Sequence, residues 1–246
     1  MSLVEKAIKG QLPFYQKMDK ETLQWIIANN PLVGVMLHKY HFDYDIVDIL
    51  KQFIPQTNWF LNQHTINGIH GLRHMLRVSA LSIKISKDKH ISEDQITNLL
   101  IAANLHDIRR NNDNSDDGHG ERCSEWLLKN KDEILSKYKL QNNKLVNIEL
   151  ISKLIYYHDI NLHDIEQTYS EDILLSILRL SDGLDRYRQP KIKWWPNFNY
   201  FNLHPSLEDQ KFAYDLVVES EKKYLLGLSN TNSVILSIKE IIKAYD

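Results

Sequence analysis

The stretch EDQITNLLIAANLHDIRR, residues 93–110, carries an apolar helical pattern that ends in a histidine and an aspartate. Leu99, Ala103 and Asp107 follow one another at steps of four, and His106 comes directly before Asp107. Residues four apart lie on the same face of an α-helix. The pattern therefore predicts a buried helix whose inward face ends in an imidazole and a carboxylate. Burying such groups without a partner costs several kcal/mol, which makes this helix end the first candidate for a functional site.

Helical periodicity continues over most of the chain, and no alternating pattern is long enough to predict a sheet. Asp19 and Ser170 are predicted N-caps, and Ser92 with Gln95 is a predicted capping box that opens the helix at 93–110. The other predicted helices cover residues 20–30, 44–54, 69–85, 121–138, 143–159 and 171–188, and two more follow near the C-terminus. The sequence predicts an all-α protein.

The composition excludes several classes of protein and site. The chain has 246 residues, of which 43% are hydrophobic and 25% are charged, as in ordinary globular proteins. Its net charge of −2 provides no basic surface for nucleic acid. Cys123 is the single cysteine, which excludes an intrachain disulfide and a metal site built on several thiolates. No membrane span or signal peptide is visible, so we expect a cytoplasmic protein without a membrane partner.

Three other predicted helices also carry a histidine or an aspartate at the end of an inward row. These positions are His74, His158 and Asp182. A single buried histidine is usually hydrogen-bonded within a core, and an aspartate near a helix end is usually a cap or an ion-pair partner. Four helices that share the feature are explained most economically by groups that converge on a metal ion. A further His-Asp dipeptide, at His163, lies off the periodic face and is predicted to be at the surface.

The candidate ligands divide into two sets. His74, His106, Asp107 and Asp182 would form a first metal site, and His119 and His158 would complete a second. Asp107 can bridge the two because each of its oxygens can face one ion. His119 lies between two glycines, and their flexible backbone is predicted to let it enter from a loop. Imidazoles and carboxylates without thiolates favour one or two divalent ions, Mn or Fe first, with Mg, Ni and Zn as further candidates.

Two arginines follow the predicted ligands by one helical turn. Arg110 lies four residues after His106, and Arg186 lies four residues after Asp182. A guanidinium can hold two phosphate oxygens at once, which makes both arginines candidate substrate-binding residues. The alternative is that they pair with nearby acids and only order the loop; the acids are Asp113, Asp116, Asp117 and Asp185. His70, one turn before His74, is a candidate proton shuttle or hydrogen-bond partner of a ligand.

At these residues the sequence resembles the HD superfamily of metal-dependent phosphohydrolases. The family signature is a histidine, a His-Asp pair and a distal aspartate on helices of one bundle. It matches HGLRHMLRV, LHDIRR and LSDGLDRYR at His74, His106-Asp107 and Asp182, and a bacterial branch adds a pair that matches His119 and His158. The resemblance covers residues 64–190. It implies an HD-type domain over 61–246 with C-terminal helices, and an N-terminal helical extension over 1–60 packed on it.

The resemblance also implies an activity. The expected reaction is hydrolysis of a phosphate ester by metal-bound hydroxide, with Asp107, Arg110 and His70 as the catalytic candidates. The expected substrate is a small soluble molecule, such as a nucleotide or a sugar phosphate. Two alternatives remain open: a dinuclear-iron oxygenase on the same scaffold, and a regulatory module whose metal is structural. The aromatic segment KIKWWPNFNYFNLHP, residues 191–205, either packs over the end of the bundle or forms a lid over the substrate.

Overall fold

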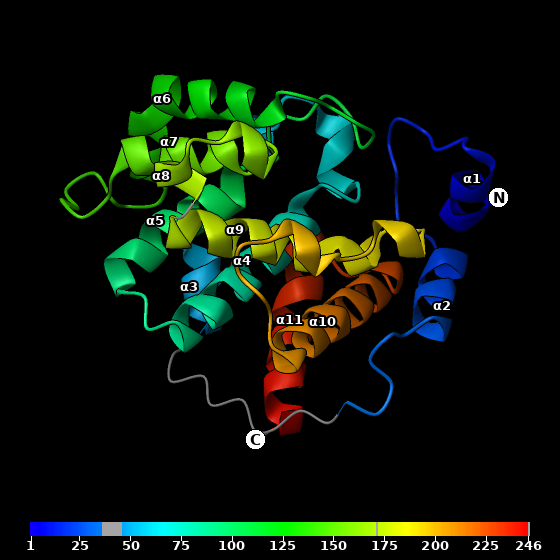
Figure 1. The fold of residues 1–246 in the computed structure, drawn as a ribbon. Coiled ribbons are helices and arrows are strands. Elements are labelled where there is room, and N and C mark those ends of the chain that lie inside the picture. The colour runs from blue at the N-terminus through cyan, green and yellow to red at the C-terminus, as the bar shows by residue number, and fades with distance from the viewer. Residues whose placement is uncertain (36–45, 171, 246) are drawn as a thin grey trace.

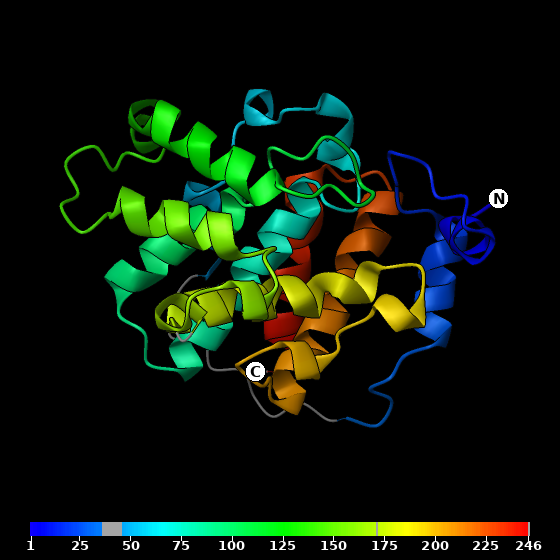
Figure 2. The ribbon, with the colours of Figure 1, turned by 45° about the horizontal axis from the view of Figure 1, so that its top comes forward.

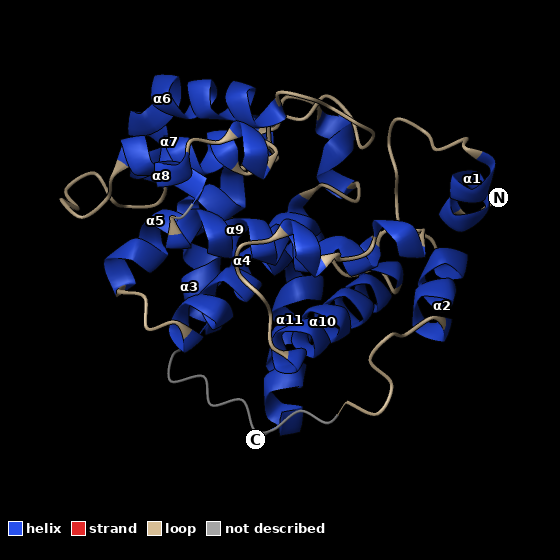
Figure 3. Ribbon diagram, viewed as in Figure 1, coloured by secondary structure: helices blue, strands red, loops and turns tan. Residues whose placement is uncertain are grey.

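The computed structural model describes residues 1–35, 46–170 and 172–245. These residues form eleven α-helices and six short 3-10 helices, and none of them lies in a strand (Figure 3). The prediction of an all-α protein is confirmed. Among the described residues, no helix has both the length and the apolar character needed to cross a membrane.

The helices follow one another along the chain in this order. The α-helices are α1 (Leu3–Lys9), α2 (Lys20–Ala28), α3 (Ile46–Gln52), α4 (Leu72–Asp88), α5 (Glu93–Leu105), α6 (His119–Lys137), α7 (Ile148–Tyr157), α8 (Gln167–Ser170), α9 (Ile173–Leu184), α10 (Leu207–Leu225) and α11 (Asn230–Tyr245). The 3-10 helices are η1 (Thr57–Trp59), η2 (Gln63–Asn67), η3 (Leu162–Asp164), η4 (Asp185–Arg188), η5 (Ile192–Trp194) and η6 (Phe198–Tyr200).

α4 lies at the centre of the fold and packs against α3, α5, α9, α10 and α11. In Figure 1 it runs between the pair α6 and α7 and the pair α10 and α11. Fifteen of its seventeen residues are buried. Its buried cations Arg73, Arg77 and Lys84 each pair with an acid of α10. The prediction of a helix with one apolar face was therefore too narrow, because neighbouring helices cover α4 all round.

Several predicted helix ends are displaced. The helix predicted at 93–110 ends at Leu105, and the helix predicted at 143–159 is the shorter α7. α4 begins at Leu72, so His70 precedes the helix on which it was predicted. The helix predicted at 44–54 is α3, and its first two residues, 44 and 45, lie outside the described residues. Tertiary contacts and side-chain caps decide where each helix stops, and periodicity alone does not report them.

The predicted N-caps have mixed outcomes. Asp19 caps α2 by accepting a hydrogen bond from the backbone N–H of Thr22, as predicted. Ser92 is the N-cap of α5, but its hydroxyl donates to the Gln95 side chain, so the capping box does not form. The prediction for Ser170 was wrong. Asp172 caps α9, because its carboxylate accepts from two backbone N–H groups of the first turn.

The N-terminal segment reaches the loop that follows α5. α1 packs on α2, and α2 packs on α10 at the side of the molecule that carries the N-terminus (Figure 1). The backbone N–H of Gln16 donates to Asp113 Oδ2 over 2.8 Å, and the N–H of Asp113 donates to the carbonyl of Phe14 over 2.7 Å. Gln16 also accepts from the N–H of Ile69. This segment therefore holds both the loop after α5 and the turn before α4.

Candidate metal centre

The six predicted ligands meet where several helix ends converge. α4, α5, α7 and α9 pack side by side (Figure 2). His106 and His158 are the C-cap residues of α5 and α7, and His119 is the first residue of α6. Their ligand atoms form three groups, each with its atoms within 4.8 Å of one another: His74–His106–Asp182, His106–Asp107–His158 and His119–His158–Asp159. The structure brings all six predicted residues together and adds Asp159.

Asp107 lies between two pairs of histidines. Its Oδ2 is 3.5 Å from His74 Nε2 and 3.8 Å from His106 Nε2. Its Oδ1 is 2.9 Å from His119 Nε2 and 3.7 Å from His158 Nε2. Oδ1 is buried. One oxygen of Asp107 therefore lies toward each pair of histidines, as a carboxylate that bridges two ions would.

The first pair, His74 and His106, presents two facing nitrogens. His74 Nδ1 lies 2.7 Å from Asp185 Oδ2, and His106 Nδ1 lies 2.8 Å from the carbonyl of Ala103. Both partners are acceptors, which assigns the N–H to Nδ1 and a lone pair to Nε2 in each neutral ring. The two Nε2 atoms are 3.2 Å apart. Two lone pairs at this distance repel one another unless a cation, a proton or a metal ion, lies between them.

The second pair repeats this arrangement. His158 Nδ1 lies 2.6 Å from the carbonyl of Ile155. His119 Nδ1 lies 2.8 Å from the carbonyl of Asp116 and 3.0 Å from Asp159 Oδ2. The Nε2 atoms of the two rings are 3.0 Å apart. Metal-binding histidines commonly donate their other ring N–H to a carbonyl or carboxylate in this way.

The spacing of these atoms fits a shared ion. Two ligands bonded to one divalent ion at about 2.1 Å lie roughly 3.0–3.4 Å apart. The Nε2 pairs are separated by 3.2 and 3.0 Å, and Asp182 Oδ1 lies 3.3 Å from His74 Nε2. The donor set of imidazole nitrogens and carboxylate oxygens suits the predicted borderline metals. The buried His/Asp groups could therefore hold metal ions.

The carboxylates of the centre favour the protonated, cationic form of two of its histidines, His74 and His119. Burial and Arg188 lower the pKa of His74, but hydrogen bonds to Asp107, Asp182 and Asp185 outweigh them and raise it to about 9. Burial likewise opposes protonation of His119, yet Asp107 raises its pKa to about 10. Metal ions compete with protons for the same nitrogens, so binding would release protons.

The two glycines beside His119 are required for different structural reasons. Gly118 has a φ of 75°, in the left-handed region that favours glycine, and it turns the chain into α6. A Cβ on Gly120 would lie 2.7 Å from the carbonyl of Ile155, so this glycine allows α6 to approach α7. His119 begins α6 after this turn. His119 was predicted to lie in a loop, but it is the first residue of the helix that follows the loop.

Sequence reasoning missed residues that orient the ligands. Asp185 holds His74 and is itself held by Arg77, whose Nε donates to Asp185 Oδ1 over 2.6 Å. Asp159 contacts His119. Both carried a signal in the sequence, because Asp185 lies one turn after Asp182 and Asp159 completes a second His-Asp dipeptide. Only the packing of the helices shows which histidine each carboxylate reaches.

A cavity of about 180 Å³ opens beside the centre. It is lined by the predicted ligands Asp107, His119, His158 and Asp182 and by His70, Arg110, Arg186 and Arg188, among others. Arg110 Nη1 lies 3.5 Å from Asp107 Oδ1, while its Nε and Nη2 donate to the carbonyls of Asn112 and Asn114. Arg110 therefore both orders the loop and faces the cavity.

Arg186 and His70 also reach the cavity. Arg186 is exposed and lines the cavity. His70 Nδ1 lies 3.3 Å from Asp113 Oδ1, and its ring centroid lies 5.9 Å from that of His74. His70 stands beside the predicted ligands but outside the three ligand groups.

The aromatic segment at 191–205 packs on neighbouring elements. Trp195 is buried against Trp25 and Tyr187, with ring centroids 5.7 and 5.6 Å away. Phe201 packs closely on Gly183 of α9. The described residues that line the cavity include none from this segment. These contacts favour packing over a lid.

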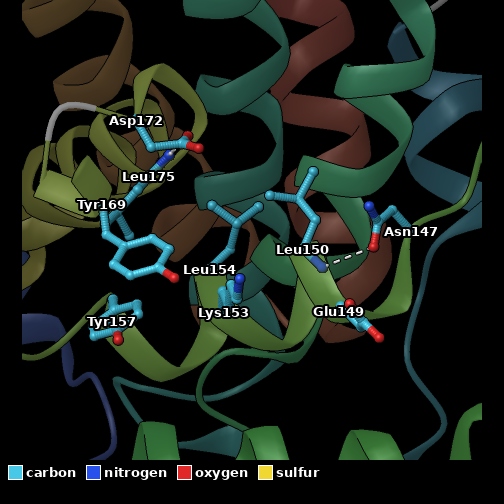
Figure 4. A pocket seen from close by; sticks show the side chains of 9 residues that line it. All are labelled: Asn147, Glu149, Leu150, Lys153, Leu154, Tyr157, Tyr169, Asp172 and Leu175. Carbon is cyan, nitrogen blue, oxygen red and sulfur yellow. Dashed lines mark hydrogen bonds between the residues drawn. The ribbon is translucent and has the colours of Figure 1, made fainter.

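A second cavity, of about 240 Å³, lies between α7, α8 and the start of α9 (Figure 4). Leu150, Leu154 and Leu175 form its apolar part, and the rings of Tyr157 and Tyr169 stack at one side. The carboxylate of Asp172, at its edge, is occupied in capping α9. The described residues that line this cavity include no histidine, which sets it apart from the metal centre.

Comparison of the chain with protein-family models, with curated proteins and with solved structures finds no match. Membership of the HD superfamily therefore stays a prediction from the motifs. The chain is an all-helical protein with buried His/Asp clusters that could bind metal.

Proposed function

We propose that this protein is a metal-dependent phosphohydrolase that cleaves a phosphate ester of a small soluble molecule. The observation that carries the proposal is the position of Asp107, whose two oxygens face two pairs of imidazole nitrogens at the edge of a cavity lined by arginines. Such a centre joins a place for divalent ions to a place for an anion. Hydrolysis of a phosphate ester by metal-bound hydroxide uses both.

The charge of the cavity supports an anionic substrate. Its lining holds three carboxylates, Asp107, Asp159 and Asp182, and three guanidinium groups, Arg110, Arg186 and Arg188. These carboxylate and guanidinium charges balance one another before the histidines are counted. One or two divalent ions, which would replace the protons on the ligating histidines, would leave the cavity positive. The volume of about 180 Å³ is small compared with the roughly 300–1,000 Å³ of drug-sized ligand sites. A phosphoryl group with a compact leaving group suits this space.

The residues of the chain have distinct parts in the proposed reaction. A divalent ion, when bound, would polarise the phosphoryl group and lower the pKa of a water molecule. Arg110 Nη1 would neutralise charge that develops on the phosphoryl oxygens. The contact of His70 Nδ1 with Asp113 leaves Nε2 as the ring nitrogen that can take up or give a proton. Asp185 and Asp159 would hold His74 and His119 in the orientation that ligation needs.

The test combines metal analysis with a substrate panel. Protein purified without chelator is analysed for metals and then assayed, with added Mn²⁺ or Fe²⁺, on phosphomonoesters and phosphodiesters. We expect bound transition metal and hydrolysis, both lost in Asp107→Ala. His163→Ala is the matched control, because this exposed histidine also belongs to a His-Asp dipeptide.

Other outcomes would favour the alternatives. Oxygen consumption by an iron-loaded protein, without phosphate release, would favour an oxygenase. Tight metal binding without turnover, and loss of stability on chelation, would favour a structural metal in a regulatory module. A protein that neither contains nor binds metal would overturn the proposal.

A further inference from the structure

A row of buried charges connects α10 with the metal centre. Arg73 and Arg77 are one turn apart on α4, Glu221 lies on α10, and Asp185 begins η4. Each of these four residues is at most 2% exposed. The row ends at His74, which Asp185 contacts directly.

The contacts along the row alternate in charge. Glu221 Oε1 and Oε2 accept from Arg73 Nε over 3.1 and 3.0 Å, and Oε1 also accepts from Arg77 Nη1 over 2.7 Å. Arg77 donates in turn to both oxygens of Asp185, from Nε over 2.6 Å and from Nη2 over 3.1 Å. Asp185 Oδ2 lies 2.7 Å from His74 Nδ1. Asp185 is thus held by a bidentate arginine that Glu221 holds from the other side.

The charge of Glu221 affects how strongly Asp185 can accept the hydrogen bond from His74. Asp185 already faces two cations, because Arg188 Nη1 lies 3.2 Å from its Oδ2. A carboxylate drawn strongly toward two arginines is a weaker acceptor for the N–H of His74. Glu221 neutralises part of the positive charge of Arg77, which weakens the attraction of Arg77 for Asp185, and its hydrogen bond to Nη1 helps to orient the guanidinium. In a buried hydrogen-bonded network of this kind, each side chain is held in its orientation by its neighbours.

From this geometry we infer that Glu221 is a positioning residue for the metal centre, acting on His74 through Arg77 and Asp185, so that metal binding and the docking of α10 are coupled. The inference rests on the proposed metal centre. Coupling between two sites is reciprocal. Loss of the Glu221 charge should weaken metal binding, and bound metal should protect the backbone of α10 against local opening.

The first experiment measures Co²⁺ binding, through its visible absorption, to metal-stripped full-length protein. We expect Glu221→Gln to raise the Kd for Co²⁺ about tenfold, the lower end of the effect of residues that orient metal ligands. Glu219→Gln is the matched control on the same helix, because Glu219 pairs with Lys222 and Lys223 at the surface. Its Kd should stay within about twofold of wild type. The absorption spectrum separates altered ligation of the ion from a general loss of stability.

The second experiment needs no variant and holds even if Glu221→Gln does not fold. Hydrogen exchange of the wild-type protein is compared with and without Co²⁺, and we expect slower exchange in α10 around Glu221 when the ion is bound. Wild-type Co²⁺ affinity in a folded Glu221→Gln protein, or exchange in α10 that Co²⁺ leaves unchanged, would overturn the coupling. If the wild-type protein binds no Co²⁺ and no other divalent ion, the metal centre itself fails, which is a separate result.

Discussion

The substitution Arg110→Lys tests whether the guanidinium of Arg110 acts on a substrate or only orders a loop. Arg110 Nε donates to the carbonyl of Asn112 over 3.2 Å, and Nη2 donates to that of Asn114 over 2.7 Å. Nη1 is the nitrogen beside the centre, 3.5 Å from Asp107 Oδ1. The three nitrogens therefore serve two purposes at once. A lysine carries the same charge on a single nitrogen and cannot keep all three contacts.

Two effects of different size follow from this geometry. Removing one donor that stabilises charge in a transition state raises the barrier by about 3 kcal/mol, so we expect kcat to fall roughly a hundredfold. Losing one of the two hydrogen bonds to the loop should lower the free energy of unfolding by about 1.5–3 kcal/mol. In a chain of this size that corresponds to a fall in Tm of roughly 3–10 °C.

Arg122→Lys is the matched control for the loop. Arg122 pairs with Asp116 over 2.7 Å and donates to the carbonyl of Asp117, but it lies outside the residues that line the cavity. We expect it to lower Tm in the same way and leave kcat near the wild-type value. Turnover of the best ester, metal content and Tm are measured on the same samples. A metal-replete Arg110→Lys protein with wild-type kcat would refute a role for Arg110 in phosphate chemistry.

Three further predictions concern metal content, pH and packing. We expect His119→Ala to lose the ion between His119 and His158 but to keep metal at His74; metal content equal to wild type in elemental analysis would contradict this. Burial raises the pKa of Asp113 to about 6. Because this lies above the unfolded value of about 3.9, the contribution of Asp113 to stability should fall by roughly 3 kcal/mol as pH rises from about 4 to 6; in denaturant titrations the difference between wild type and Asp113→Asn should change by this amount, and a difference that stays constant with pH would contradict it. A Cβ on Gly183 would lie 2.1 Å from Phe201 Cζ, so Gly183→Ala should reduce stability by about 1–3 kcal/mol; an unchanged Tm would show that the Phe201 ring moves aside freely.

Two physical rules made the helical class and the residues of the candidate metal centre predictable from the sequence. The geometry of an α-helix is local, so residues three and four apart share a face whatever the helix packs against. His106, His158 and Asp182 each continue an apolar row, and that is visible without knowing any neighbour. Buried polar groups need partners, and for this reason the sequence also predicted that these residues lie close to His74 and Asp107.

What holds these ligands in place was decided by tertiary structure. Arg77 reaches Asp185, 108 residues away, and Arg73 reaches Glu221, 148 residues away. A period in the sequence reports which side of a helix is buried, but not which distant side chain covers it. The sequence predicted one inward row for the helix at 69–85, and it did not show that Arg73 of α4 would lie buried against α10. The position of each helix end has the same origin, because it depends on contacts and caps that form only when the helices pack.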